Sequence, residues 1–154
     1  MGINGDLVFR TSHGESVPNV VNYVNNWLHE HPKGEIHVGA DSKKCGHKTK
    51  YSVSICMWEN NYGVHEIHHT ELINNYPDDF SRLWEEVERV VVIARKLNDL
   101  SAKIHVHVDL NNDPRFFSNK LYEASMGFIT SLGFQAYGKP NAWAASCGAH
   151  KYCQ

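Results

Sequence analysis

The chain has 154 residues, of which 42% are hydrophobic and 21% charged, so it can form one folded domain with a substantial core. No apolar run approaches the ~20 residues of a membrane span, and the amino terminus lacks the basic and apolar segments of a secretory signal, so we expect a cytoplasmic protein with no membrane contact. The net charge of −2 argues against a surface built entirely for nucleic acid, yet it allows an enzyme with a local basic groove.

Hydrophobic periodicity divides the chain into a short lead-in and one domain. Residues 1–16 are polar and contain glycines, and we expect an irregular or hairpin-like lead-in before a single domain over 17–154. The domain opens with a helix that Pro32 closes. Residues 36–40 then form an apolar run typical of a buried strand, and the polar residues 42–49 predict a loop.

The rest of the chain alternates between strand and helix patterns. The expected elements are a strand over 51–57, a strand over 64–72, a helix started by Pro77 with Asp78 or Asp79, a strand over 103–109, a helix over 121–132, a strand over 134–137 and a last helix capped by Asn141. Short turns join the first three strands, which predicts antiparallel pairing, whereas helices separate the later strands, which predicts strands parallel to the first. The fold class is therefore α/β, with a mixed five-stranded sheet flanked by helices and an extra N-terminal helix.

Two aspartates stand where predicted strands end. Asp41 follows the run 36–40, where Gly39 leaves room for a close backbone approach, and Asp109 ends the strand over 103–109. Asp disfavours strands and is costly to bury unpaired, so stability does not explain this placement. Open α/β sheets bind ligands beyond the carboxyl ends of their strands. If a right-handed crossover lays the two strands side by side, the two carboxylates can hold divalent cations between them.

The long central helix supplies a third acid. Glu86 lies four residues before Val90 and eight before Ala94, so it shares a face with core residues, whereas Glu85 lies on the wet face and Glu88 near the edge. Periodicity therefore favours Glu86, and the alternative is a surface glutamate beside a slightly rotated apolar stripe. Three converging acids repel one another, and Mg²⁺ or Mn²⁺ relieves this because hard cations bind carboxylate oxygens. Two such ions about 3.5–4 Å apart suit phosphodiester hydrolysis.

Three motifs follow one another along the chain. Residues 38–42 read Val-Gly-Ala-Asp-Ser, residues 107–111 read His-Val-Asp-Leu-Asn, and residues 139–146 read Lys-Pro-Asn-Ala-Trp-Ala-Ala-Ser. They resemble the Gly-Thr-Asp-Ser, His-Ile/Val-Asp-Ile-Asn and Lys-Pro-Asp-x-x-Ala-Ser motifs of a ribonuclease H-like family of bacterial and phage proteins. The resemblance runs from about residue 17 to the C-terminus, and the last motif is its most specific part. It implies a ribonuclease H-like fold with a carboxylate site for two divalent metal ions.

Carried over by position, the resemblance implies four catalytic and metal-binding residues. Asp41, Glu86 and Asp109 correspond to the first three acids. The fourth residue comes from the last helix, where this chain has His150 in place of an Asp or Asn. Because histidine can ligate a metal or move a proton, we expect His150 to complete the site or to act in proton transfer. The alternatives are a weaker second-metal site, an inactive site and a surface histidine near a helix end.

Other polar residues are expected to bind the substrate or support the site. The candidate substrate-binding residues are Ser42, Lys43, Lys44, Lys139 and Asn141. Lysines beside a carboxylate site can track a nucleic-acid backbone, and Lys139 can meet a phosphate. His107 points to the same sheet face as Asp109 and could orient a metal ligand, although a core histidine is the commoner outcome.

Three functional hypotheses follow. The first is a Mg²⁺- or Mn²⁺-dependent nuclease that acts on RNA, DNA or a hybrid by a two-metal mechanism. The second is a catalytically weak or inactive ribonuclease H-like module that binds nucleic acid or a protein partner. The third is a small zinc protein using Cys147, His150 and Cys153, with Cys45 or His47; zinc ranks last because the spacing is not that of a known finger or ribbon. The sequence indicates neither a particular substrate nor an oligomeric state.

Overall fold

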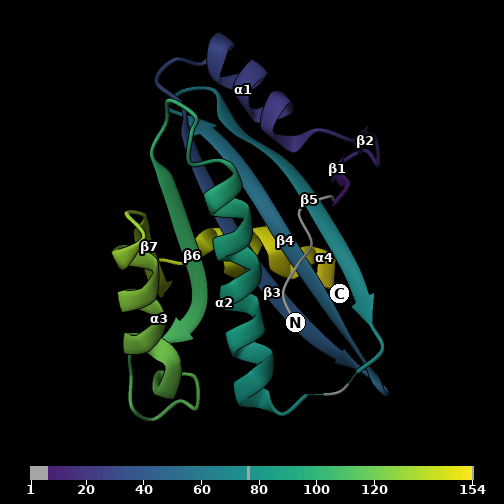
Figure 1. The fold of residues 1–154 in the computed structure, drawn as a ribbon, viewed down its shortest axis with the longest axis vertical. Coiled ribbons are helices and arrows are strands. Elements are labelled where there is room, and N and C mark those ends of the chain that lie inside the picture. Colours follow the sequence, from purple (N-terminus) through teal and green to yellow (C-terminus); the bar gives the residue numbers. More distant parts are fainter. Residues whose placement is uncertain (1–6, 76, 154) are drawn as a thin grey trace.

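One mixed sheet with helices on both faces organises the protein (Figure 1). The computed structural model describes residues 7–75 and 77–153, apart from the side chain of Cys147. Within this part of the chain the strands are β1 (Phe9–Thr11), β2 (Ser16–Val17), β3 (Glu35–Cys45), β4 (Lys48–Glu59), β5 (Gly63–Ile73), β6 (Ile104–Asn111) and β7 (Gln135–Lys139). The helices are α1 (Val20–Glu30), α2 (Asp79–Lys96), α3 (Asn119–Ser131), the π-helix η1 (Ala144–Ala149) and α4 (His150–Cys153). Among the described residues, no helix combines the length and hydropathy that crossing a membrane requires.

The sheet has the strand order β2-β1-β5-β4-β3-β6-β7 over the described residues. β3, β4 and β5 are antiparallel neighbours, whereas β6 is parallel to β3 and β7 is parallel to β6. This arrangement confirms the predicted α/β class and the mixed sheet, in which hairpins join the early strands and helices separate the later ones.

The predicted number of five strands is wrong because the lead-in contributes two more. β1 and β2 form a small hairpin, and β1 pairs with β5 through Arg10↔His68 and Thr11↔Ile67. Strands of three and two residues are too short for a recognisable alternation of apolar and polar side chains. The first six residues of the predicted lead-in over 1–16 lie outside the described residues.

The polar loop predicted over 42–49 is also wrong. β3 and β4 stay paired as far as Cys45↔Lys48, and the hairpin turns at Gly46, whose φ of 64° lies in the left-handed region that glycine adopts easily. Polar side chains line this outer part of the hairpin, so hydrophobic alternation does not mark it as a strand. Asp41 consequently lies within β3 and not after its end.

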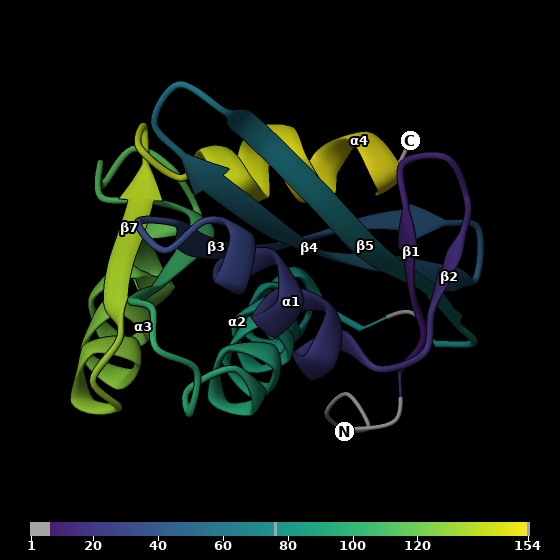
Figure 2. The ribbon, with the colours of Figure 1, turned by 90° about the horizontal axis from the view of Figure 1, so that it is seen from above.

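Helices cover the two faces of the sheet in two separate layers (Figure 2). α1, α2 and α3 lie on one face, and η1 and α4 lie on the other. Side chains of β3 alternate between these layers. Ile36, Val38 and Ala40 belong to the hydrophobic core that α2 covers, whereas Gly39 faces η1.

Gly39 permits the close approach of the C-terminal helix to the sheet. A Cβ atom at this position would lie 2.3 Å from the carbonyl carbon of Ala144 and 2.4 Å from the backbone nitrogen of Ala145. No side chain fits in that space. The close backbone approach predicted just before Asp41 is therefore confirmed, and its partner is η1.

The starts of two helices test the predicted caps. α2 begins directly after its N-cap Asp78, whose Oδ1 accepts a 2.7 Å hydrogen bond from the Ser81 N–H. Of the two predicted starts, Asp78 and Asp79, the structure therefore selects Asp78. The predicted cap of the last helix, Asn141, is wrong, because η1 begins only at Ala144. Asn141 instead closes a turn, in which its N–H donates to the Gly138 carbonyl at 2.8 Å.

Candidate active site

A stripe of polar side chains runs along one face of β3 and β6, two strands that otherwise carry core residues. The strands are parallel, with His37 opposite His105 and Gly39 opposite His107. Because side chains alternate along a strand, every second residue of both strands points toward the layer of η1 and α4. The polar stripe comprises Glu35, His37 and Asp41 on β3 and His105, His107 and Asp109 on β6.

Three acids meet at one end of the polar stripe, which we call the carboxylate end: Asp41, Asp109 and, from α2, Glu86. Asp41 and Glu86 are buried, and Asp109 is partly exposed. Burial raises the pKa of Asp41, a hydrogen bond with His150 opposes this, and the charge of Asp109 adds to it. Burial, reinforced by the charges of Asp41 and Asp109, holds the pKa of Glu86 well above its usual range. The structure therefore places the three predicted acids within electrostatic reach of one another.

Glu86 is held by a short network between α2 and β3. Ser42, the residue after Asp41, points to the α2 side of the sheet, and its hydroxyl donates a hydrogen bond to Glu86 Oε2. Arg82 Nη1 donates to Ser42 Oγ at 2.8 Å and lies 3.6 Å from Glu86 Oε2. This network holds α2 in a fixed position against β3, so that Glu86 lies at the edge of the polar stripe.

His150 brings the C-terminal helix to the first aspartate. It is the first residue of α4, and its Nδ1 lies 2.6 Å from Asp41 Oδ2. More than half of its side chain is exposed, so it stands at the mouth of the site. The packing of η1 on Gly39 sets this position, because α4 continues directly from η1.

Asp109 contacts a lysine and a serine from the C-terminal part of the chain. Lys139 Nζ, at the end of β7, lies 3.1 Å from Asp109 Oδ1, and the Ser146 hydroxyl donates to the same oxygen at 3.3 Å. Glu86 and Asp109 therefore each have a cationic neighbour, Arg82 and Lys139, whereas Asp41 has a hydrogen-bonded histidine. A bound cation or phosphate could replace these partners.

The other predicted substrate-binding residues occupy different settings. Lys44 Nζ lies 2.6 Å from Asp79 Oδ1, which ties the hairpin to the start of α2. Lys43 is exposed on the hairpin and pairs in register with Lys50 of β4. Asn141 is exposed in the turn before η1. The lysines of the β3–β4 hairpin thus place positive charge beyond the carboxylate end, farther along β3.

His107 lies on the predicted face but turns toward the middle of the polar stripe. It is fully buried, and its Nε2 lies 2.8 Å from Nδ1 of His37. Burial, with the neighbouring His37 and His105, lowers its pKa to about 3, so it is neutral. This is the hydrogen-bonded core histidine that the sequence offered as the commoner outcome.

The predicted zinc group of Cys147, His150 and Cys153 has one member whose side chain, that of Cys147, lies outside the described residues. Burial, with the charges of Asp41 and Glu86, raises the pKa of Cys153 to about 12. A thiol that keeps its proton is a poor metal ligand. The potential metal-ligating group found in the described part of the chain is a different one, Glu35 with His37 and His105.

Comparison with protein-family models decides the family. The model described as Ribonuclease H-like matches residues 18–154. The chain belongs to this ribonuclease H-like family. The family resemblance stated from the three motifs is thereby confirmed, and the mixed α/β sheet agrees with a ribonuclease H-like fold. No curated protein and no solved structure matches the chain significantly.

Two residues that contact the acids of the carboxylate end were not among the predicted site residues. Arg82 precedes Glu86 by one helical turn, and this spacing alone places both on one face of α2. Ser146 lies within the last motif, but only the fold shows that it contacts Asp109. The i, i+4 spacing was the available signal for Arg82, whereas no local pattern pointed to Ser146.

Proposed function

We propose that this protein is a metal-dependent nuclease that hydrolyses phosphodiester bonds at the carboxylate end. The observation that carries the proposal is the convergence of Asp41, Glu86 and Asp109, in which burial and mutual repulsion raise the pKa values of Asp41 and Glu86. Such a group gains by binding positive charge. Membership of the ribonuclease H-like family supports the same reaction class.

The donor set fits hard divalent cations. Asp41, Glu86 and Asp109 offer carboxylate oxygens, the preferred ligands of Mg²⁺ and Mn²⁺, and these three residues would hold two ions with His150 at the rim. When bound, such ions supply Lewis-acid stabilisation to the attacking and leaving oxygens of a phosphoryl displacement. The basic neighbours of the acids would then be released to other partners.

The protein's own residues divide the remaining tasks. Lys139, whose ammonium group contacts Asp109, would bind a phosphate oxygen of the substrate. Arg82 and Ser42 keep Glu86 in place by holding the same carboxylate oxygen. His150 is hydrogen-bonded to Asp41 through Nδ1 and would move a proton at the mouth of the site. The lysines of the β3–β4 hairpin would guide the nucleic-acid backbone.

A cleavage panel tests this function. Tag-free protein is incubated with an RNA/DNA hybrid, RNA, single- and double-stranded DNA and branched DNA, with Mg²⁺, with Mn²⁺ or with a chelator. The proposal predicts metal-dependent cleavage of at least one substrate, lost in Asp41→Asn and Asp109→Asn. Asp99→Asn, an exposed aspartate in the turn after α2, is the matched control. Equal cleavage by the two site variants and the wild type contradicts the proposal.

A second function, a ribonuclease H-like module that binds nucleic acid or a protein partner without cleaving it, is favoured by one observation. Lys139 already forms an ion pair with Asp109, and His150 is hydrogen-bonded to Asp41, so protein side chains already contact two of the acids that would bind a cation. This function predicts binding that is insensitive to metal and to Asp41→Asn. Calorimetric titration with Mn²⁺ separates the two, because the nuclease binds the ion and the module does not.

A further inference from the structure

We propose that Glu35, His37 and His105 form a second metal site, for Zn²⁺, at the opposite end of the polar stripe. We call these three residues the histidine end. The proposal concerns residues that the carboxylate end does not use and does not depend on nuclease activity. His37 and Asp41 are four residues apart on β3, which separates the two ends by about 13 Å.

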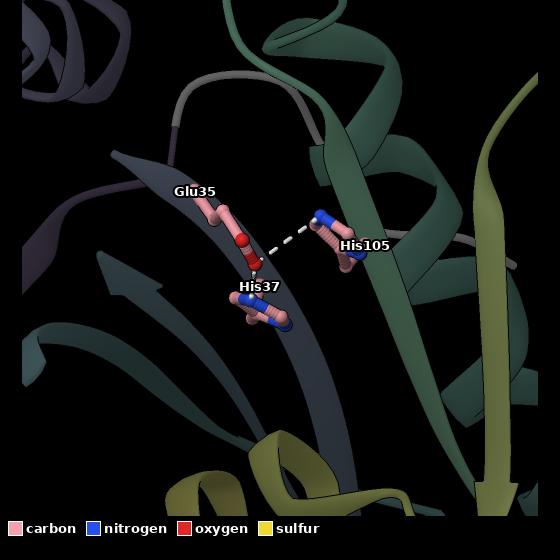
Figure 3. A group of neighbouring side chains, drawn as sticks. All are labelled: Glu35, His37 and His105. Carbon is pink, nitrogen blue, oxygen red and sulfur yellow. Dashed lines mark hydrogen bonds and ion pairs between the residues drawn. The ribbon is translucent and has the colours of Figure 1, made fainter. Parts of the chain in front are cut away.

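Three potential ligand atoms converge at the histidine end (Figure 3). Glu35 Oε1 lies 2.9 Å from His37 Nε2 and 3.5 Å from His105 Nε2, and all three atoms lie within 4.8 Å of one another. Ligand atoms bound to one tetrahedral zinc ion at about 2.0–2.1 Å are about 3.3 Å apart. The two measured separations lie on either side of this value, so a small adjustment of the side chains would seat an ion.

The sheet itself sets this arrangement. Glu35 and His37 are two residues apart on β3 and share a face, and His105 lies opposite His37 in the parallel register of β6. The imidazole rings of His37 and His105 stack with centroids 4.3 Å apart. Because strand pairing fixes the backbone on both sides, the ligands are held in place before any ion binds.

One ring nitrogen of His105, Nε2, has no hydrogen-bond partner among the described residues. The side chain is 9% exposed, and the buried Nε2 lies 3.5 Å from Glu35 Oε1. Its Nδ1 lies 2.8 Å from the Tyr137 hydroxyl, which donates its own proton to Gln135 Oε1 at 3.3 Å. The hydroxyl oxygen therefore accepts the Nδ1 proton of His105. This leaves a lone pair on Nε2 opposite the Glu35 carboxylate, an arrangement that a cation between them stabilises.

Neutral imidazoles are the metal-binding form of histidine, and burial favours it here. Burial lowers the pKa of His37, although the hydrogen bond that His37 donates to the Glu35 carboxylate opposes this shift. Burial also lowers the pKa of His105. Two nitrogens and one carboxylate oxygen match the three-ligand zinc sites that keep a fourth position open. Borderline cations such as Zn²⁺ favour imidazole more than Mg²⁺ does.

His107 acts as a positioning residue for His37. Its Nε2 lies 2.8 Å from His37 Nδ1, and its Nδ1 accepts a hydrogen bond from the Ala144 N–H at 3.4 Å. The contact with His107 fixes the orientation of the His37 ring, so that Nε2 of His37 faces Glu35. Outer partners of zinc-bound histidines orient the ligand ring in the same way.

The fourth position of the ion opens into a cavity. A cavity of about 270 Å³ is lined by Glu35, His37, Trp58, Val64 and Trp143. The Trp143 ring centroid lies 4.7 Å from that of His37, so an indole wall borders the site. Water or a small anion could reach the ion from this side.

Calorimetry on tag-free, EDTA-stripped full chain tests the proposal. Zn²⁺ is titrated in the presence of excess Mg²⁺, which occupies the oxygen ligands of the carboxylate end. We expect one Zn²⁺ per chain, affinity at least about 100-fold lower in His105→Gln, and a loss of about 10–100-fold in His107→Gln. Asp41→Asn should bind Zn²⁺ like the wild type.

Glu35→Gln keeps the test decisive if a histidine variant fails to fold, because the Glu35 side chain is 39% exposed. We expect at least a 10-fold loss of Zn²⁺ affinity in Glu35→Gln and none in the matched control Glu30→Gln, an exposed residue at the end of α1. Co²⁺ titration should give the visible absorption of a low-coordinate nitrogen site, absent in Glu35→Gln. Unchanged Zn²⁺ affinity in Glu35→Gln, or loss of Zn²⁺ in Asp41→Asn, overturns the proposal and leaves nuclease activity to be judged separately.

Discussion

The two ends of the polar stripe lie on the same strands and respond to burial in opposite ways. At the carboxylate end, burial raises the pKa values of Asp41 and Glu86, so these acids attract a proton or a cation. At the histidine end, burial lowers the pKa values of His37 and His105, which favours the neutral rings that can bind a metal. One physical effect thus favours hard cations at one end and borderline cations at the other.

The two ends also differ in what holds them. The histidine end lies inside the parallel register, where His37 is opposite His105. The carboxylate end lies beyond the last paired residues, Gly39 and His107, and relies on α2, η1 and α4 for Glu86, Ser146 and His150. Helix packing can shift without unpairing strands, so the carboxylate end is the more adjustable one.

Removing one carboxylate should abolish cleavage at the carboxylate end and leave the histidine end unchanged. We expect Asp41→Asn and Asp109→Asn to lower the cleavage rate by about 10²–10³-fold or more, because each removes a charge that stabilises the transition state. Single-turnover cleavage with Mg²⁺ measures the effect, with Asp99→Asn as the control. A rate within a few fold of the wild type would mean that these acids are not catalytic.

Gly39→Ala should disturb the packing of η1 on the sheet, on which the carboxylate end depends. The added Cβ would lie 2.3–2.5 Å from backbone atoms of Ala144 and Ala145, and backbone cannot turn aside as a side chain can. We expect destabilisation of about 1–3 kcal/mol or more in urea unfolding, with loss of cleavage. Gly127→Ala on α3, where a Cβ meets nothing within 4 Å, is the control and should be neutral or stabilising by up to about 1 kcal/mol. Equal stability of the two variants would contradict the close packing of η1 on β3.

Glu86→Gln should stabilise the metal-free protein at high pH. A carboxyl whose pKa is raised by folding binds its proton more tightly in the folded state, so stability falls as pH rises from the ordinary value of 4.5 toward the raised one. Glutamine removes this cost, and at pH 8 in EDTA we expect a gain of about 1–3 kcal/mol, or about 2–4 °C in Tm per kcal/mol.

Thermal unfolding from pH 4 to pH 8 measures this gain, which should vanish near pH 4. Glu123→Gln, an exposed residue of α3, serves as the control and should leave the pH profile unchanged. A Glu86→Gln protein less stable than the wild type at pH 8 would show that the ion pair with Arg82 outweighs the cost of burial.

Lys139→Gln should have the smallest effect. Loss of one phosphate contact should weaken nucleic-acid binding a few fold and lower the slope of log affinity against log salt by about 0.7–0.9. Fluorescence anisotropy at several salt concentrations measures both. Lys33→Gln, an exposed lysine before β3, should change neither. An unchanged slope in Lys139→Gln would remove Lys139 from the substrate site.

Most of the sheet could be predicted because buried apolar residues recur at every second position of its strands, as Ile36 and Val38 do in β3. The β1–β2 hairpin and the outer part of β3 could not, because short or polar strands have no such pattern. The start of α2 was recognisable through Asp78, whose side chain caps the helix by accepting a hydrogen bond from the Ser81 N–H, three positions away. The predicted helix cap at Asn141 was wrong because the π-helical start of η1 depends on tertiary packing against Gly39.

The candidate site was predictable where one residue departs from its surroundings. Asp41 and Asp109 each follow an apolar run, and Glu86 shares the core spacing of its helix, so local pattern was enough. No role was predicted for His37 and His105, because they simply alternate with apolar residues in their strands. Only the pairing of β3 with β6 brings these two residues together across 68 positions of sequence. The contact between Ser146 and Asp109 also depends on the fold alone.

Anomalous diffraction from crystals soaked in Mn²⁺ tests whether the three acids of the carboxylate end hold metal ions. We expect manganese peaks between Asp41 and Asp109, with Glu86 among the ligands and Lys139 displaced from Asp109. The same peaks should be absent from crystals of Asp41→Asn. Fully soaked wild-type crystals that show no manganese at these three acids, with His150 and Lys139 still in contact with Asp41 and Asp109, would show that the carboxylate end is not a metal site.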